Sequence, residues 1–351
     1  MTSRERVLAA IAHKRTDRAP ADYSGHRPVT ERLMERLGIK DDEAFLQALG
    51  IDMRRVSFDY SQPSGAPDAE GFRQDMWGAK VRTRKGYEGF PELISPFGED
   101  STVDDVHAHA WPDPSKLDYS GIRPQCAKYH DEYATFGAPW SPFFHEVGWL
   151  IGQEPFFIWL HTKPEVLQAI IDHIVDYEVE ALRRFLAAAE GLLDIVYIGN
   201  DFGTQRSLFI APEQWVQFMR KPLKRFYDMA HDHGCKVMQH SCGCVRPVIP
   251  FLIEDGVDVL DPVQVAAEGM DLASLVRDFG PRLAFHGGVD TQRTLPFGSE
   301  ADVRAEVRSY LNLTREKGGY ILAGSQEYMM DIPPENLLAI YDENKGLKRR
   351  K

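Results

Sequence analysis

The chain has few cysteines, no long apolar run and no excess of basic residues. It contains 4 cysteines in 351 residues, and three of them fall between positions 235 and 244, which does not make a disulfide framework. A reducing compartment, the cytoplasm, is therefore expected. No apolar stretch approaches the length of a membrane span, and the net charge of -12 disfavours an anionic partner. We predict a small-molecule substrate and neither a nucleic-acid nor a membrane partner.

The length and composition leave the class of fold open between two architectures. A chain of 351 residues could form two average domains, but α/β barrels of this length fold as one unit. With 43% hydrophobic and 27% charged residues, the composition is that of an ordinary globular protein. No Gly-x-Gly-x-x-Gly motif follows an early strand, which weakens the case for a dinucleotide-binding fold.

Strand-like and helix-like segments alternate with short loops from about residue 134 onward. Apolar runs predict strands at 53–60, 136–144, 193–200, 236–243, 257–263, 283–289 and 320–323. Amphipathic stretches predict helices at 163–189, 212–233, 245–255, 271–279, 300–317 and 333–341. This alternation is typical of parallel strands buried on both faces. We therefore predict that residues 1–351 form a single (β/α)8 TIM barrel domain, in preference to an open doubly wound sheet.

The residues before 134 add N-terminal helices and an insertion. Thr2 and Glu5 have the spacing of a capping box, which begins one helix. Segments 28–38 and 41–49 predict two more helices, each ending at a glycine. The stretch 61–125 is rich in Pro, Gly and aromatic residues, and we expect it to be an insertion with a hairpin around 77–84 that covers the barrel mouth.

Polar side chains follow almost every predicted strand, where the functional groups of such a barrel lie. A single Asp or Asn there could also cap the next helix, and for Asp261 and Asp290 this alternative stays open. The candidates are Asp59, Tyr60, His145, Glu146, Asn200, Asp201, His240, Cys242, Asp261, His286, Asp290, Gln326 and Glu327.

His240 and Cys242 form the sharpest chemical pattern in the chain. They lie two residues apart at the end of a short strand, so their side chains point to the same face. Zinc is bound by such pairs of nitrogen and sulfur ligands. The competing interpretation is a small buried cysteine next to an unrelated histidine. The position at a strand end, followed by Gly243, favours a metal site.

Further motifs run along nearly the whole chain. They are Arg4-Glu-Arg-Val-Leu-Ala-Ala-Ile, Trp77-Gly, Trp111-Pro-Asp-Pro, Asn200-Asp-Phe-Gly-Thr-Gln205, His240-Ser-Cys-Gly243, Gly256-Val-Asp258, Gly287-Gly-Val-Asp290 and Pro333-Pro-Glu-Asn336. With these motifs the chain resembles the uroporphyrinogen decarboxylase superfamily, and within it the branch of cobalamin-dependent methyltransferases. The resemblance implies a (β/α)8 barrel and is compatible with a homodimer.

The decarboxylases of this superfamily hold the carboxylates of a porphyrinogen with arginines of an Arg-Gln-Ala-Gly-Arg motif. At the matching place this chain has Asp22-Tyr-Ser-Gly-His-Arg27, so only Arg27 remains. Asp59 lies where the decarboxylases keep an aspartate. A substrate with many carboxylates needs several cations around it, so we predict no useful decarboxylation of uroporphyrinogen.

The methyltransferases of this superfamily are similar to zinc enzymes with a His-x-Cys pair and a distant third Cys. His240 and Cys242 match the pair, but Gln326 stands in the place of the third cysteine. The resemblance therefore implies zinc, with Gln326 or the neighbouring carboxylate of Glu327 as the third ligand. Cys244 remains a further alternative.

The first functional hypothesis is zinc-assisted methyl transfer between a methyl-corrinoid (cobalamin) on a partner protein and a small thiol or oxygen compound. Asp59, Glu146 and Asp201 would orient this substrate. Its other contacts would be Arg27, Tyr60, His145, Asn200, Gln205 and His286. The second hypothesis is a metal-free decarboxylase of porphyrin biosynthesis, in which Arg27 holds a carboxylate and Asp59 steers a protonated intermediate. The third is a barrel that only binds a small molecule or a partner.

Overall fold

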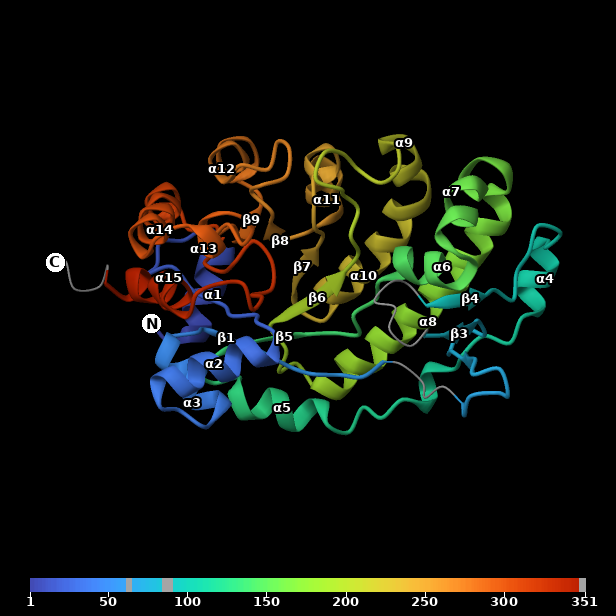
Figure 1. Ribbon diagram of the computed structural model, residues 1–351, viewed down its shortest axis with the longest axis horizontal. Helices are drawn as coiled ribbons and strands as arrows, with labels where there is room; N and C mark the ends of the chain where they lie inside the picture. The colour runs from blue at the N-terminus through green and yellow to red at the C-terminus, as the bar shows by residue number, and fades with distance from the viewer. Residues whose placement is uncertain (61–64, 84–90, 347–351) are drawn as a thin grey trace.

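A computed structural model describes residues 1–60, 65–83 and 91–346. Within these residues, seven parallel strands form one curled sheet in the order β1-β5-β6-β7-β8-β9-β10 (Figure 1). They are β1 (Met53–Arg55), β5 (Ala134–Gly137), β6 (Ile195–Gly199), β7 (Lys236–His240), β8 (Val259–Val263), β9 (Ala284–Gly287) and β10 (Tyr320–Ile321). The predicted class of fold, an α/β barrel of parallel strands, is confirmed.

A short segment, residues 20–22, closes the gap between the two edges of this sheet. The N–H of Asp22 donates a hydrogen bond to the carbonyl of Leu322 next to β10, at 2.9 Å. On the other side, the N–H of Asp52 next to β1 donates to the carbonyl of Ala21, also at 2.9 Å. The segment 20–22 therefore fills the eighth position of the barrel without forming a regular strand.

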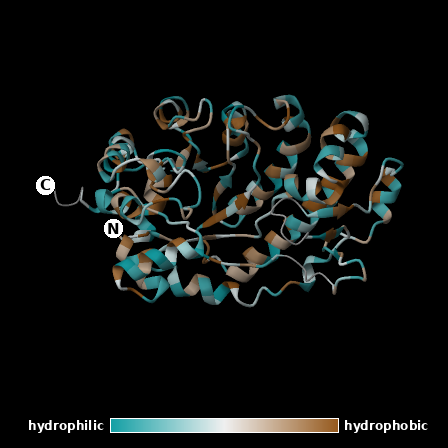
Figure 2. Cartoon of the chain, viewed as in Figure 1, coloured by the Kyte–Doolittle hydropathy of each residue, from teal (hydrophilic) through white to brown (hydrophobic). Residues whose placement is uncertain are grey.

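Helices cover the outer face of the sheet. The chain begins with α1 (Ser3–Ile11), α2 (Arg27–Leu37) and α3 (Asp42–Leu49). The helices between the strands are α5 (Ile122–Tyr129), α6 (Phe143–Ile151), α7 (Gln153–Thr162), α8 (Pro164–Ala189), α9 (Pro212–Trp215), α10 (Lys221–Asp232), α11 (Ile249–Asp255), α12 (Leu272–Phe279), α13 (Thr294–Phe297) and α14 (Glu300–Thr314), and the last helix is α15 (Pro334–Gly346). Figure 2 shows strands that are largely hydrophobic and outer helices in which hydrophobic and hydrophilic residues alternate. No helix among the described residues has both the length and the apolar character to cross a membrane.

Helix α1 closes the amino end of the barrel. Val7 and Ile11 of this helix pack into one cluster with Met53, Ile195 and Met238, which point inward from the strands. The capping box that the sequence predicts begins this helix, because Thr2 accepts from the N–H of Glu5 and Glu5 accepts from the N–H of Thr2. With this end filled by side chains, the carboxyl ends of the strands form the accessible mouth.

The predicted insertion forms a small separate sheet and several short helices. Its strands are β2 (Arg73–Gln74), β3 (Lys80–Arg82) and β4 (Glu92–Ile94), followed by the helix α4 (Val103–Ala108). The hairpin expected around 77–84 joins β2 and β3, although its last residue, Arg84, lies outside the described residues. In Figure 1 this unit lies beside α6, α7 and α8. None of its described residues lines the cavity at the mouth, so they do not form the cover that the sequence predicts.

Two predicted strands are shorter than expected. The strand predicted at 136–144 ends at Gly137, and Phe143 and Phe144 begin α6 instead. Pro139 and Pro142 explain this difference, since proline has no N–H to donate to a ladder and is well placed immediately before a helix. The strand predicted at 53–60 pairs only as far as Val56, whose N–H donates to β5.

Candidate active site and metal centre

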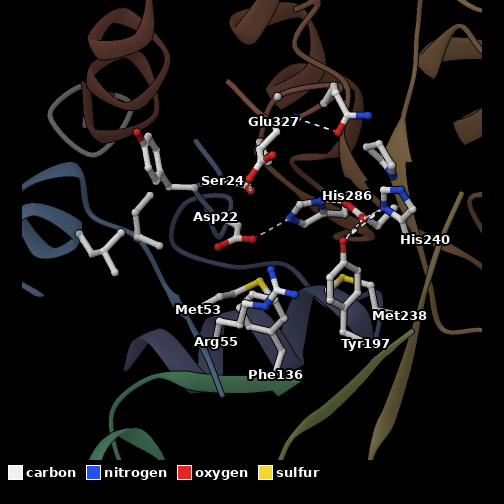
Figure 3. A pocket seen from close by; sticks show the side chains of 18 of the residues that line it. Asp22, Ser24, Met53, Arg55, Phe136, Tyr197, Met238, His240, His286 and Glu327 are labelled. Carbon is white, nitrogen blue, oxygen red and sulfur yellow. Dashed lines mark hydrogen bonds and ion pairs between the residues drawn. The ribbon is translucent and has the colours of Figure 1, made fainter. Parts of the chain in front are cut away.

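The mouth of the barrel holds a cavity of about 490 Å³. Figure 3 shows its lining, with polar groups on one side and apolar side chains on the other. The apolar floor is made by Met53, Phe136 and Met238, which point inward from β1, β5 and β7. The polar wall consists of Asp22, Ser24, Arg55, Tyr197, His240, Asp261, His286, Gln326 and Glu327.

A continuous chain of ionisable groups crosses this polar wall. His240 Nδ1 lies 2.8 Å from Asp261 Oδ2, and His286 Nδ1 lies 2.5 Å from Asp261 Oδ1. His286 Nε2 lies 3.2 Å from Asp22 Oδ2. Tyr197 adds a third donor, since its hydroxyl donates to Asp261 Oδ2 at 2.8 Å. Asp261 thus accepts hydrogen bonds from Tyr197 and His240 and forms an ion pair with His286, and these three partners belong to three different strands.

The pKa of Asp261 is lowered and that of His286 is raised, so a carboxylate and an imidazolium lie side by side. Burial alone would raise the pKa of Asp261, but the charge of His286 and the hydrogen bonds from both imidazoles hold it well below its usual range. Burial would lower the pKa of His286, yet Asp261 and Asp22 raise it to about 10. The ionised carboxylate of Asp261 therefore fixes the orientation of both histidine rings.

The second nitrogen of His240 faces two other metal-binding groups. Its Nε2 lies 3.5 Å from Cys242 Sγ and 3.3 Å from Asp201 Oδ1. One ligand atom from each of these three residues lies within 4.8 Å of the other two, and no other such group of three exists among the described residues. The N–H of Cys242 donates to Asp201 Oδ1 at 2.8 Å, which fixes this carboxylate beside the thiol. Asp201 therefore lies with His240 and Cys242 in a group of three side chains that could hold a metal ion.

The carboxyl group of Asp201 is kept ionised by its neighbours. Burial would raise the pKa of its carboxyl, but hydrogen bonds with His240 and the N–H of Cys242 lower it to about 2. His145 supports the same residue from behind, because its Nε2 accepts from the N–H of Asp201 at 3.0 Å. The structure thus places Asp201 with the metal-binding pair, whereas the sequence predicts that it orients the substrate.

The two residues predicted as third metal ligand have other contacts. Gln326 does lie at the pair, but its amide nitrogen donates to Cys242 Sγ at 2.9 Å, and its oxygen accepts from the N–H of Glu327. Glu327 points away from the pair. Its carboxylate lies 3.0 Å from His26 Nε2 and accepts from the hydroxyl of Ser24 at 3.2 Å. Neither residue offers an oxygen to the His240–Cys242 pair in this arrangement.

Several predicted substrate contacts lie outside the cavity. Arg27 is exposed on α2, where it forms ion pairs with Glu31 and Asp42. Asp59 is exposed and does not line the cavity. Asn200 is buried and holds the start of α6, since its side chain accepts from the N–H of Phe144. None of these three side chains lines the cavity, so their predicted contacts with a substrate remain predictions.

Gln205 also lies away from the cavity. Its amide nitrogen donates to the side chain of Gln264 at 3.2 Å, and Gln264 in turn accepts from the N–H of Gly243. Gln205 therefore braces the loop after β7 rather than facing the cavity. Of the predicted substrate contacts, only His286 lines the cavity.

Glu146 and Tyr60 belong to a second buried polar group, behind α6. The Tyr60 hydroxyl donates to Glu146 Oε1 at 3.2 Å, and Trp77 Nε1 donates to Oε2 at 2.6 Å. Burial raises the pKa of Glu146 to about 7. Glu178 on α8 is completely buried nearby, and neither of its carboxylate oxygens has a hydrogen-bond partner among the residues that the structure describes. Neither Glu146 nor Tyr60 lines the cavity, so their predicted contact with substrate is not supported.

Sequence reasoning missed several residues of the cavity, and four of them carry polar or aromatic side chains that shape it. Asp22 and Arg55 come from the N-terminal part of the chain, Tyr197 from the middle of a strand, and Trp140 from the loop after β5. A signal existed for Arg55, since residues two apart on a strand share a face and Met53 is an obvious inward residue. Asp22 carried no such signal, because it lies in an irregular segment that pairs with the sheet only through tertiary contacts.

Comparisons with known proteins agree with this architecture. A family model described as uroporphyrinogen decarboxylase (URO-D) matches residues 76–346. Among solved structures, a methyltransferase from Methanosarcina mazei is similar with a TM-score of 0.68 and 18% sequence identity, over 99% of this chain and 99% of that chain. At this identity the second similarity shows the fold alone. No curated protein matches the chain.

Proposed function

Because the chain belongs to the uroporphyrinogen decarboxylase family and holds nitrogen, sulfur and oxygen donors together at its barrel mouth, we propose that it is a zinc-assisted methyltransferase. The methyl group would pass between a methyl-corrinoid on a partner protein and a small thiol or oxygen compound in the cavity. The resemblance of the His240–Cys242 motif to the corrinoid-dependent branch motivates the choice of partner.

The observation that carries this proposal is the triad of Asp201, His240 and Cys242. Zinc is bound by imidazole nitrogen, thiolate and carboxylate oxygen, and a catalytic zinc site has three protein ligands and one open position. The donor set therefore fits zinc. When bound, the metal would lower the pKa of a substrate thiol or hydroxyl, so that an anionic nucleophile exists at neutral pH.

The residues around the triad support the same role. Asp261 accepts from His240 Nδ1, which leaves the lone pair of Nε2 directed at the triad. Gln326 donates to Cys242 Sγ, and such a bond stabilises negative charge on the sulfur. Tyr197 fixes Asp261 in turn. Of the triad, His240 lines the cavity, whose volume of about 490 Å³ is that of a small-molecule site.

Metal content after zinc loading and desalting tests the proposal. We expect about one zinc per chain in the wild type, as for a site of this kind, and a large loss in Cys242→Ser and Asp201→Asn. Cys244→Ser is the matched control, because Cys244 is buried outside the triad. Glu327→Ala should keep the metal. If Cys242→Ser retains a full equivalent of zinc, the pair does not bind metal and the proposal fails.

The description of the family favours a second candidate, a metal-free decarboxylase. The lining of the cavity disfavours this candidate. Uroporphyrinogen carries many carboxylates, which need several cations, and Arg55 is the only arginine among the described lining residues. Two assays separate the candidates. Demethylation of methylcobalamin by a small thiol, followed by absorbance, should depend on zinc and on Cys242. Conversion of uroporphyrinogen at a rate comparable with an authentic decarboxylase would favour the second candidate.

A further inference from the structure

Two consecutive arginines at the end of β1 have opposite surroundings. Arg54 faces outward and is buried. It forms an ion pair with Glu43 at 2.6 Å, donates to two backbone carbonyls, and lies 3.7 Å from the centre of the Tyr133 ring. Arg55 faces the interior of the barrel together with Met53 and lines the cavity (Figure 3). The alternation of a strand thus directs one guanidinium into the wall and the other into the cavity.

Arg55 has no hydrogen bond or ion pair to any residue that the structure describes. Its nearest recorded contact is the face of Tyr197, with 5.7 Å between the guanidinium carbon and the ring centre. The three carboxylates of the cavity wall are each engaged elsewhere. Asp261 and Asp22 hold His286, and Glu327 lies against His26. Arg55 is therefore a cation whose charge the cavity leaves uncompensated.

We infer that Arg55 binds the carboxylate of a small substrate that carries a single negative charge. This inference rests on the proposed function and names the substrate class of the same cavity. A guanidinium offers two parallel N–H groups that match a carboxylate. The reacting sulfur or oxygen would then lie at the other side of the cavity, beside His240 and Cys242. A short apolar linker between the two groups would pack on Met53, Phe136 and Met238.

The charges of the wall favour a monoanion over a phosphate. Asp22 and Asp261 face His286 and His240, and Glu327 faces His26, so Arg55 is the cation left for a ligand. A phosphate dianion would bring one negative charge more than this single guanidinium neutralises. At short range, like charges repel strongly where water is partly excluded. A carboxylate balances the single guanidinium and adds no excess charge.

Calorimetric titration with two isosteric probes tests this inference. The probes are 3-mercaptopropionate and its neutral amide, 3-mercaptopropionamide. The wild type should bind the acid about tenfold to a hundredfold more tightly than the amide, which is the usual effect of one charge-assisted hydrogen-bonded pair. Arg55→Gln should remove this preference, and Arg55→Lys should retain part of it. Arg27→Gln, which removes the same charge outside the cavity, should behave like the wild type.

The outcomes separate this inference from the proposed function. Arg55 makes no hydrogen bond, so Arg55→Gln should unfold at the wild-type temperature and its binding data can be compared directly. In Cys242→Ser, both thiol probes should weaken, but the ratio of acid to amide affinity should persist. If zinc does not bind and this ratio still depends on Arg55, only the proposed function fails. If the wild type shows no preference for the acid, or if Arg55→Gln keeps it, the role of Arg55 is refuted.

Discussion

Asp261 at the barrel mouth and Glu178 behind α6 are both buried carboxyl groups, but the protein treats them in opposite ways. Asp261 is 5% exposed, accepts hydrogen bonds from Tyr197 and His240, and forms an ion pair with His286. Glu178 is 0% exposed and has no hydrogen-bond partner. Burial and the charge of Glu146 raise the pKa of Glu178 well above its usual value, whereas the pKa of Asp261 is held well below its own.

The difference shows which region is arranged for charge. Burial by itself favours the neutral form of a carboxyl group, so a buried carboxylate stays ionised only where donors surround it. The mouth surrounds Asp261 with partners from three strands, and it thereby fixes His240 of the Asp201–His240–Cys242 triad. The region behind α6 supplies Trp77 and Tyr60 to Glu146 alone. A carboxylate kept fully ionised at neutral pH therefore marks the candidate active site, whereas burial raises the pKa of both carboxyl groups behind α6.

Removal of the charge at the mouth should have the largest effect. In Asp261→Asn, two imidazoles and a tyrosine lose their shared anionic acceptor, and breaking a buried ion pair costs about 3–5 kcal/mol. Urea unfolding should show this loss in the free energy of unfolding. Asp271→Asn is the matched control, because Asp271 caps α12 at the surface and Asn caps a helix equally well. A loss below about 1 kcal/mol in Asp261→Asn, within the range of an ordinary hydrogen bond, would show that the mouth does not depend on this charge.

The pKa of Glu146 is raised, whereas that of Asp261 is lowered. Glu146 should therefore make the free energy of unfolding fall as the pH rises. Its folded pKa of about 7 lies above the ordinary value of 4.5, so the folded state binds an extra proton between these values. The contribution of this group is complete below about pH 4.5 and is lost as the pH rises through 7, by about 3 kcal/mol in total. Glu146→Gln mimics the protonated form, so its stability relative to the wild type should rise between pH 5 and pH 8.

Thermal or urea unfolding at several pH values measures this difference. Glu154→Gln on the exposed side of α7 is a suitable control and should track the wild type at every pH. Parallel curves for Glu146→Gln and the wild type would mean that Glu146 does not titrate in this range.

Removal of the unpartnered carboxyl group should give the smallest effect, and it should be a gain. Glu178→Met replaces a buried polar group that lacks hydrogen bonds with an apolar side chain of similar length. The expected increase in the free energy of unfolding is about 1–3 kcal/mol at neutral pH. Glu178→Gln, which keeps unpartnered polar atoms, should gain less. A loss of stability in both variants would indicate that Glu178 has a favourable contact, such as a bound water.

Much of the fold follows from local signals in the sequence. The capping box at Thr2, the glycines that end the N-terminal helices, and the alternation of strands and helices after residue 134 all correspond to observed elements. The wrong assignment of Phe143 and Phe144 shows the limit of hydrophobicity alone, because a buried helix and a buried strand are equally apolar over a few residues. Pro142 was the signal that separates them.

The candidate site was only partly predictable for a different reason. The His240–Cys242 pair is local, and strand periodicity brings it to one face. The third group of the triad is not local, since Asp201 reaches the pair through the register of β6 and β7, which aligns Gly199 with His240. Arg27 was predicted to contact the substrate because it matches the Arg-Gln-Ala-Gly-Arg motif. The arginine that lines the cavity is instead Arg55. Which of several strand-end groups meet depends on register and barrel curvature, and neither can be read from one sequence.

The segment 20–22, which fills the eighth position of the barrel, limits where the chain can be truncated. The matched family region begins at residue 76, yet the eighth position of the barrel, β1 and several cavity residues, Asp22 and Arg55 among them, precede it. A fragment trimmed to 76–346 would leave β5 and β10 as bare parallel edges, and such edges recruit strands from other molecules. It would aggregate rather than report on the site. The first 75 residues complete the barrel wall, so truncation studies must leave them attached.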